Sequence, residues 1–176
     1  SMMGSDLFPR VPDIKEMNCP YTGEKLTLLP ALNPDVAILH TQRCDAYGNV
    51  QSYGLPFMDQ DIALAANRVI VSTERIISND QVRRNPDQTK IPFFCVDAVV
   101  EAPFGCLPHE CYGEYEPDFQ HMDAYVKLMM GKGPDGVSEY LDKYVYGPPT
   151  WNDYLEMGGF KNILQAMTKG RAIYND

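Results

Sequence analysis

Three polar side chains follow a short apolar run closely enough to form one binding site. The run is Val36–Leu39, and it is followed by Gln42, Arg43 and Asp45. An arginine guanidinium binds a carboxylate through two parallel hydrogen bonds, and a glutamine amide can donate to a carbonyl oxygen. The spacing therefore predicts a ligand site at these three residues.

The same residues have structural interpretations, which the sequence leaves open. Arg43 could form an ion pair with Asp45 or Asp35. Gln42 could be a buried amide whose hydrogen bonds are all made within the protein. His40, just before them, is expected to be a packed histidine at the end of the strand.

Three more residues could support chemistry from turns and strand ends. Glu24 lies in a Thr-Gly-Glu turn and could act as a general base, and Glu101 ends an apolar run and could reach a pocket. His109 lies in the following loop and could bind substrate or move a proton. Plainer roles compete with these: an exposed turn carboxylate for Glu24, a cap of the next turn for Glu101, and a histidine without a positioned partner for His109.

A short segment also has residue types that bind metals. Cys106, His109 and Cys111 place three candidate ligands within six residues. Zinc sites normally draw on a second pair of ligands, and the sequence shows no obvious second pair. We therefore expect no metal.

The elements that must position these residues have the pattern of a parallel sheet. Apolar runs with polar ends predict buried strands over residues 35–41 and 68–74, with a helix over 59–67 between them. A third strand, or a broken pair, is predicted over 93–100. Because ligands in open α/β sheets bind beyond the carboxyl ends of the strands, the polar cluster after Leu39 is well placed for a site.

The organisation predicted for the whole chain is one domain of three parts. Residues 1–34 are a loop-rich segment with a short strand over 25–29, residues 35–117 are the sheet core, and residues 118–176 are a helical tail. Helices are predicted over 118–130, 136–145 and 151–167, separated by Gly and Pro. The fold class is therefore α/β, a mostly parallel open sheet with flanking helices and a helical carboxyl-terminal tail.

Composition excludes several classes of protein. The chain has 176 residues and a formal net charge of −9, which argues against nucleic acid and anionic membranes as main partners. No apolar stretch approaches the ~20 residues of a membrane helix. Five cysteines at irregular spacing, without a visible export signal, indicate free thiols and a cytoplasmic protein.

Four motifs in order give the chain a specific resemblance. They are Cys19–Leu26, the Gln-Arg-x-Asp and Gly-Asn-Val pattern within Pro34–Val50, Arg68–Glu74, and Val99–Gly113. Together they resemble the α subunit of family I coenzyme A transferases, the glutaconate and 3-oxoacid type. The resemblance implies transfer of CoA between an acyl-CoA and a carboxylic acid. It also implies a β subunit that shares the active site and supplies the nucleophilic glutamate.

The resemblance has two departures. Family α subunits are longer and begin with a βαβ half bearing a glycine-rich loop, and no such loop precedes Cys19, so this chain is expected to be the carboxyl-terminal part of a subunit. The family nucleophile lies in a Glu-x-Gly context. The only such sequence here is Glu156-Met157-Gly158, which suits a helix end better. The chain alone is therefore predicted to be inactive.

The resemblance leaves the CoA-binding residues unknown and two other functions open. Arg83, Arg84 and Lys90 could meet the phosphates of CoA, although basic residues in a polar loop are more often simply solvated. The same scaffold could instead serve an acyl-CoA hydrolase or a ring-opening enzyme, with a base such as Glu24 activating water. It could also be a non-catalytic module for CoA binding or assembly. A Glu-x-Gly sequence in the partner would favour transfer, and its absence would favour hydrolysis.

Overall fold

A computed structural model describes residues 4–6, 8–55, 57–159 and 162–167, in two compact units, residues 1–34 and 35–176. The first unit holds a 3₁₀ turn, η1 (Phe8–Arg10), and an antiparallel pair, β1 (Lys15–Asn18) and β2 (Lys25–Leu28). Gly23, with φ +76°, takes the left-handed conformation in the turn between the two strands. The sequence predicted β2 but not its partner β1.

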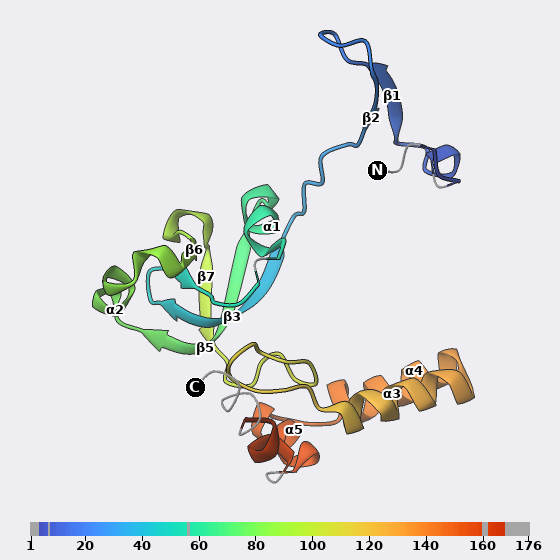
Figure 1. Cartoon of the computed structure of the whole chain (residues 1–176). Coiled ribbons are helices and arrows are strands. Elements are labelled where there is room, and N and C mark those ends of the chain that lie inside the picture. Colours follow the sequence, from blue (N-terminus) through green and yellow to red (C-terminus); the bar gives the residue numbers. More distant parts are fainter. Residues whose placement is uncertain (1–3, 7, 56, 160–161, 168–176) are drawn as a thin grey trace. The chain divides into compact units, whose positions relative to one another are not determined.

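The second unit is built on a five-stranded sheet in the order β6-β4-β3-β5-β7 (Figure 1). The strands β3 (Ala37–Asp45), β5 (Val69–Ile77) and β7 (Ala98–Glu101) run parallel to one another. The short strands β4 (Val50–Gln51) and β6 (Thr89–Ile91) complete one side, with β4 antiparallel to both of its neighbours. The expected mostly parallel α/β sheet is confirmed.

Short helices connect these strands. They are α1 (Asp59–Ala65), α2 (Asn79–Arg84), and the 3₁₀ turns η2 (Pro86–Gln88) and η3 (Phe93–Cys95). The predicted helix over 59–67 is confirmed in shorter form. Arg83, Arg84 and Lys90, which were assigned to a polar loop, lie at the end of α2 and in β6. A capping box between Ser78 and Gln81 begins α2.

The core of the sheet comes from the amino-terminal halves of β3 and β5. Ala37, Leu39, Val69 and Val71 are all buried, and they pack with Cys44, Val50, Ala63 and Ile91. Burying a side chain the size of valine or leucine contributes about 1.5–3 kcal/mol. These apolar runs therefore fix where the two central strands lie, as the sequence predicted.

The two central strands extend further than predicted. β3 continues through the polar cluster to Asp45, and β5 continues to Ile77, with Arg43 directly opposite Arg75. The polar residues therefore belong to the strand itself, and do not lie beyond its end. Residues 93–95 form η3 and no strand, because Cys95 and Val96 donate their backbone N–H groups within the turn, to the carbonyls of Pro92 (3.0 Å) and Phe93 (3.1 Å).

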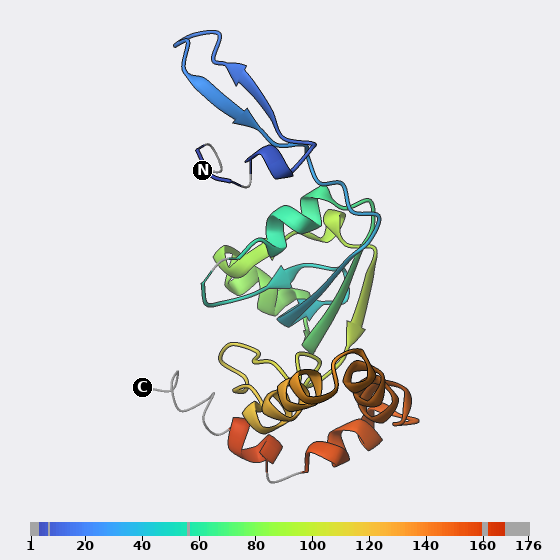
Figure 2. The same ribbon diagram turned by 90° about the vertical axis from the view of Figure 1, so that its right-hand side faces the viewer.

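The tail is helical. It contains α3 (Phe119–Lys132), α4 (Pro134–Leu141), a π-helical turn η4 (Asp142–Tyr146) and α5 (Trp151–Gly158), and α3 and α4 lie side by side (Figures 1 and 2). Helix α5 ends sooner than predicted, since Gly159 takes φ +78°. Residues 162–167 are helical again. Positions 160–161 of the predicted helix, and residues 168–176 of the predicted tail, lie outside the described residues.

Hydrogen bonds attach the tail to the segment that follows β7. Trp151 Nε1 donates to the Pro103 carbonyl (3.0 Å), and Asp118 N donates to the Pro108 carbonyl (2.9 Å). Within the described part of the chain, no helix has the length and apolar character needed to cross a membrane.

Candidate functional site

A cavity of about 370 Å³ lies against the middle of β3, at His40, Thr41 and Gln42. Its apolar lining includes Val50, Leu55, Phe57 and Ile91. Its polar lining includes side chains from β3, from the segments after β4 and β7, and from β6, namely His40, Gln42, Tyr53, Tyr112, Lys90 and Glu110. The mixture suits a ligand with both an apolar and a polar part.

Gln42 forms part of the cavity wall and is only 6% exposed. Its Nε2 donates to two backbone carbonyls, those of Tyr53 (3.3 Å) and Tyr112 (3.1 Å). Both amide hydrogens are therefore engaged in holding two loops together. What remains for a ligand is the amide oxygen, which accepts hydrogen bonds.

Arg43 is half-buried, and its guanidinium lies over the ring of Tyr53, with Cζ 5.2 Å from the ring centroid. Among the described residues no ion pair joins it to Asp35 or Asp45, and its buried Nε has no hydrogen-bond partner. The Tyr53 hydroxyl donates to Glu114 (2.8 Å), which also binds Arg75. Two arginines from neighbouring strands thus lie around a single carboxylate, Arg75 directly and Arg43 through Tyr53.

Asp45 shapes a turn. One carboxylate oxygen accepts hydrogen bonds from the backbone of Tyr47 and Asn49, and the other accepts from the amides of Asn49 and Asn79. Burial would raise the pKa of Asp45, but the four hydrogen bonds outweigh it and lower the pKa below its usual range. The buried carboxylate is therefore fully occupied within the protein.

Of the predicted site residues only Gln42 lines the cavity, since Arg43 and Asp45 are not among its lining residues, and the other three lie elsewhere in the chain. Glu24 is exposed in the first unit, where its backbone N donates to Thr22 Oγ1 (3.3 Å). Glu101 ends β7 and accepts from the backbone N of Ile76 (2.9 Å) in the neighbouring strand. His109 is exposed in the loop that precedes α3. None of the three lines the cavity.

His40 connects the cavity to a buried polar cluster. Its Nε2 lies 2.7 Å from Glu74 Oε1, and its Nδ1 lies 2.9 Å from Ser72 Oγ. Glu74 is 7% exposed and also accepts from the Tyr115 hydroxyl (2.7 Å) and the backbone N of Phe104 (2.8 Å). His40 is therefore held by specific polar partners and is more than a packed histidine.

Ionisation in this cluster follows from its contacts. Burial would lower the pKa of His40, but contacts with Cys106 and Glu74 outweigh it and raise the pKa to about 9. Burial would raise the pKa of Glu74, but hydrogen bonds from His40, Phe104 and Tyr115 lower it. At neutral pH the pair is thus an imidazolium and a carboxylate, and His40 also lines the cavity.

Residues that could hold a metal lie beside this pair. His40, Cys106 and Cys111 bring one ligand atom each to within 4.8 Å of one another. His109, which the sequence placed with the two cysteines, is not in the group.

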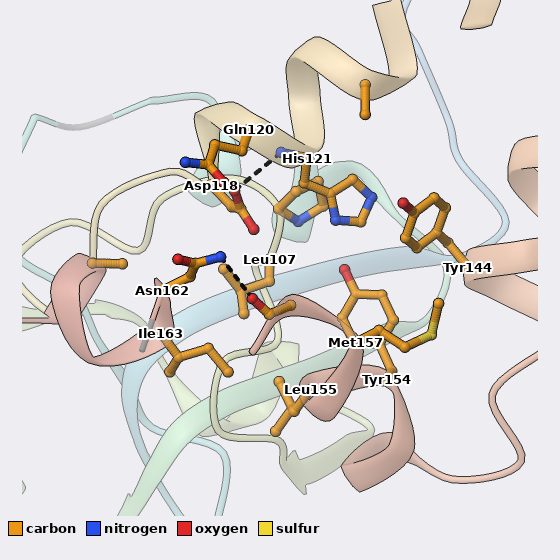
Figure 3. Close-up of a pocket in the computed structure, with 14 residues that line it drawn as sticks. Leu107, Asp118, Gln120, His121, Tyr144, Tyr154, Leu155, Met157, Asn162 and Ile163 are labelled. Carbon is orange, nitrogen blue, oxygen red and sulfur yellow. Dashed lines mark hydrogen bonds between the residues drawn. The ribbon is translucent and has the colours of Figure 1, made fainter. Parts of the chain in front are cut away.

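A second cavity, of about 220 Å³, lies in the tail (Figure 3). His121, Tyr144 and Tyr154 line it together with Asp118, whose carboxylate accepts from the backbone N of His121 (3.0 Å). His121 Nε2 also contacts the Tyr140 hydroxyl (2.8 Å), and burial lowers the pKa of its ring. The polar groups of His121 are therefore engaged in hydrogen bonds within the protein, and the larger cavity on β3 is the better candidate site.

Sequence reasoning missed Tyr53, Glu74, Tyr112 and Tyr115. Glu74 carried a usable signal, because it ends an apolar strand in the same way as His40 ends the preceding one. The strand register places His40 opposite Ser72, and Glu74 two residues later lies on the same face. The tyrosines carried no such signal, since they approach the site from loops distant in sequence.

Comparison with known proteins gives a consistent result. The family model described as Coenzyme A transferase matches residues 1–102. The A-type subunit of glutaconate CoA-transferase from Acidaminococcus fermentans is 37% identical over 88% of this chain and 49% of its own length. The A-type subunit of 3-oxoadipate CoA-transferase from Pseudomonas knackmussii is 34% identical over 86% of this chain and 52% of its own length.

The fold agrees with these sequence matches. The crystal structure of glutaconate coenzyme A-transferase from Acidaminococcus fermentans superimposes with a TM-score of 0.81 and 35% identity, over 88% of this chain and 48% of that chain. The chain thus spans about half the length of these two curated relatives.

Proposed function

Because this chain belongs to the coenzyme A transferase family, we propose that it is part of the α subunit of an enzyme that moves CoA between an acyl-CoA and a carboxylic acid. The resemblance seen in the four sequence motifs is confirmed by the family match. Both curated relatives are named as one lettered subunit of a CoA-transferase, which supports a two-subunit enzyme with a β partner.

The cavity on β3 is the proposed substrate site of this half. Its apolar residues would contact the acyl chain, and His40 and Gln42 of β3 lie beside them in the lining. Lys90 brings a cation to the lining, with Nζ 2.9 Å from the Asp87 carbonyl. It is the candidate for an anionic group of the acid or of CoA.

Arg43 remains the candidate for the substrate carboxylate. Its Nε is buried without a hydrogen-bond partner, so a donor there is unused in the described structure. Its guanidinium lies over Tyr53, which lines the cavity. Arg43 itself is not among the lining residues, so the proposal requires Tyr53 to move aside before a carboxylate can reach the guanidinium.

The reaction proposed for the complete enzyme begins with a glutamate of the β subunit. Its carboxylate attacks the thioester carbonyl and expels the CoA thiolate, giving a mixed anhydride. The thiolate then attacks the glutamyl carbonyl of the anhydride, releasing the first acid and leaving a glutamyl-CoA thioester. The second acid reverses these steps. This chain would orient the acids and the thioester.

The chain's own Glu-x-Gly sequence does not suit the nucleophile. Glu156 is exposed on α5, and Gly158 ends that helix, with Gly159 N bonded to the Glu156 carbonyl (3.1 Å). Glu156 therefore lies in an ordinary helix end, away from the cavity lining. This supports the expectation that the chain alone is inactive.

The test is reconstitution with the partner. The tagged chain is used to isolate a stoichiometric partner, and the complex receives acetyl-CoA with a panel of carboxylic and dicarboxylic acids. New acyl-CoA, detected by mass spectrometry, is expected from the complex and not from the chain alone. Changing the partner's Glu-x-Gly glutamate to glutamine should abolish transfer. Turnover by the isolated chain would contradict the proposal, and release of free CoA without transfer would instead favour a hydrolase.

A further inference from the structure

The fold brings two cysteines of one loop to a histidine of the central strand. Cys106 and Cys111 lie between β7 and α3, whereas His40 lies on β3. Their ligand atoms, one nitrogen and two sulfurs, all lie within 4.8 Å of one another. In sequence these cysteines were grouped with His109 and lacked an obvious second pair of ligands, whereas the fold brings them to His40, far earlier in the chain.

We propose that His40, Cys106 and Cys111 form a zinc site. Thiolate and imidazole are the ligands that zinc prefers, whereas magnesium and calcium prefer oxygen. Tetrahedral zinc with ligand bonds of about 2.0–2.3 Å requires its ligand atoms to lie roughly 3.5–4 Å apart. The three atoms are already near that separation, so only small side-chain adjustments are needed.

The surroundings of His40 suit a metal ligand. A ligating histidine usually donates its other ring N–H to a carboxylate, which fixes the tautomer. Here Nε2 contacts Glu74 (2.7 Å), so Nδ1 is the nitrogen that remains for a metal. The Ser72 hydroxyl, which contacts Nδ1, also donates to the Leu39 carbonyl (3.3 Å) and keeps that partner when Nδ1 turns to a metal.

Charge and burial also suit zinc. Two thiolates neutralise one Zn²⁺, and the remaining thiol protons and the Nδ1 proton of the His40 imidazolium are released when the metal binds. Cys111 is 5% exposed, and the His40 side chain is 11% exposed.

Three protein ligands leave one coordination position for water. The bound metal would tie the loop after β7 to the central strand, next to the cavity that His40 lines. This inference does not depend on the proposed transferase activity, because all three ligands belong to the described residues of this chain.

Metal binding to the full chain tests the proposal. The chain is treated with a chelator under a thiol-free reductant, and Zn²⁺ is then titrated in competition with a chromophoric chelator. One Zn²⁺ per chain is expected. Co²⁺ in its place should give thiolate-to-cobalt charge-transfer absorption and the intense visible bands of tetrahedral cobalt.

Variants assign the ligands. Cys106→Ser, Cys111→Ser and His40→Gln should each weaken zinc binding by more than the ~10–100-fold typical for loss of an outer hydrogen-bond partner. Cys19→Ser, in the first unit, is the matched control and should bind as the parent chain does. Circular dichroism of the metal-free variants checks that they are folded. If a variant does not fold, the cobalt spectrum of the unaltered chain decides whether thiolates bind the metal. Absence of zinc binding, cobalt spectra without thiolate bands, or unchanged affinity in folded cysteine variants would each overturn the proposal.

Discussion

His40 and Glu74 lie on neighbouring parallel strands and meet at a distance of 2.7 Å between Nε2 and Oε1. Neither side chain is exposed by more than 11%. Glu74 also holds Tyr115 and the backbone of Phe104, so a single carboxylate connects both central strands to the loop that follows β7. Loss of this carboxylate should therefore loosen the loop and the strands together.

Glu74→Gln should destabilise the chain by about 3 kcal/mol. Removal of one partner from a buried ion pair leaves the charge of the other partner, here His40, uncompensated. The amide hydrogens of the new glutamine would also lie against groups that donate hydrogen bonds to Glu74. The midpoint of urea unfolding at pH 7 measures the loss. Glu156→Gln, an exposed change on α5, should stay within about 0.5 kcal/mol of the parent chain. Equal midpoints for the two variants would contradict this account of Glu74.

The thiol of Cys106 should react as a thiolate well below neutral pH in the metal-free chain. Contacts with Cys111 and His40 lower its pKa to about 5, from the usual 9.0. The alkylation rate by iodoacetamide, followed at Cys106 by peptide mass spectrometry, should be nearly constant from about pH 9 to about pH 7 and fall as the pH drops through about 5.

Two variants separate the causes of that shift. Cys111→Ala removes the largest contribution and His40→Ala removes the imidazolium, so each should move the inflection of the alkylation profile to higher pH. If the inflection stays near the ordinary thiol value in the parent chain as well, the contacts do not lower the pKa of Cys106.

Gly105→Ala should disturb the same cluster by steric contact. A Cβ at this position would lie 2.6 Å from His40 Cε1 and 2.9 Å from the Ala102 carbonyl oxygen. Such overpacking costs about 1–3 kcal/mol. Gly131→Ala is the matched control, because a Cβ there meets nothing within 4 Å inside helix α3, and it should stabilise by about 0.5–1 kcal/mol. The thermal unfolding midpoints of the two variants should therefore shift in opposite directions.

Arg43→Lys should weaken binding of the acid in the reconstituted enzyme, if the proposed function is correct. Lysine cannot form the bidentate contact with a carboxylate. Loss of one charged hydrogen bond corresponds to about 1.5–3 kcal/mol, or about 10–100-fold in KM for the acid, with a smaller effect on KM for the acyl-CoA. Arg68→Lys, an exposed arginine before β5, is the control. Equal KM values for the acid in both variants would exclude Arg43 from the substrate site.

The sequence predicted the sheet well and the site less well, for identifiable reasons. The apolar runs that form β3 and β5 locate the two central strands because burial of valine and leucine dominates their placement. The predicted strands ended before their polar carboxyl-terminal residues. Nothing in the local sequence indicates that Gln42 donates hydrogen bonds to the carbonyls of Tyr53 and Tyr112. Those partners come from loops and depend on the tertiary fold.

The cysteines illustrate the same limit. Spacing within residues 106–111 grouped Cys106 with His109, yet the described structure leaves His109 exposed and brings His40 to the thiols. The approach of β3 to the loop after β7 is a long-range contact, which no local pattern reveals. The spacing of residues also did not reveal the contacts of Glu24 and Glu101. Glu24 makes its contact within a turn, and Glu101 makes its contact with the neighbouring strand.

The position of His40 between the cavity and the two thiols makes its ring a natural spectroscopic reporter. One part of the imidazole belongs to the cavity wall, and its other neighbours are Glu74 and the cysteines. The chain contains three histidines, so the ring proton signals in a nuclear magnetic resonance spectrum are few enough to assign. A ligand entering the cavity and a change at the thiols would both register at the same ring, which allows occupancy and cysteine chemistry to be followed together in one sample.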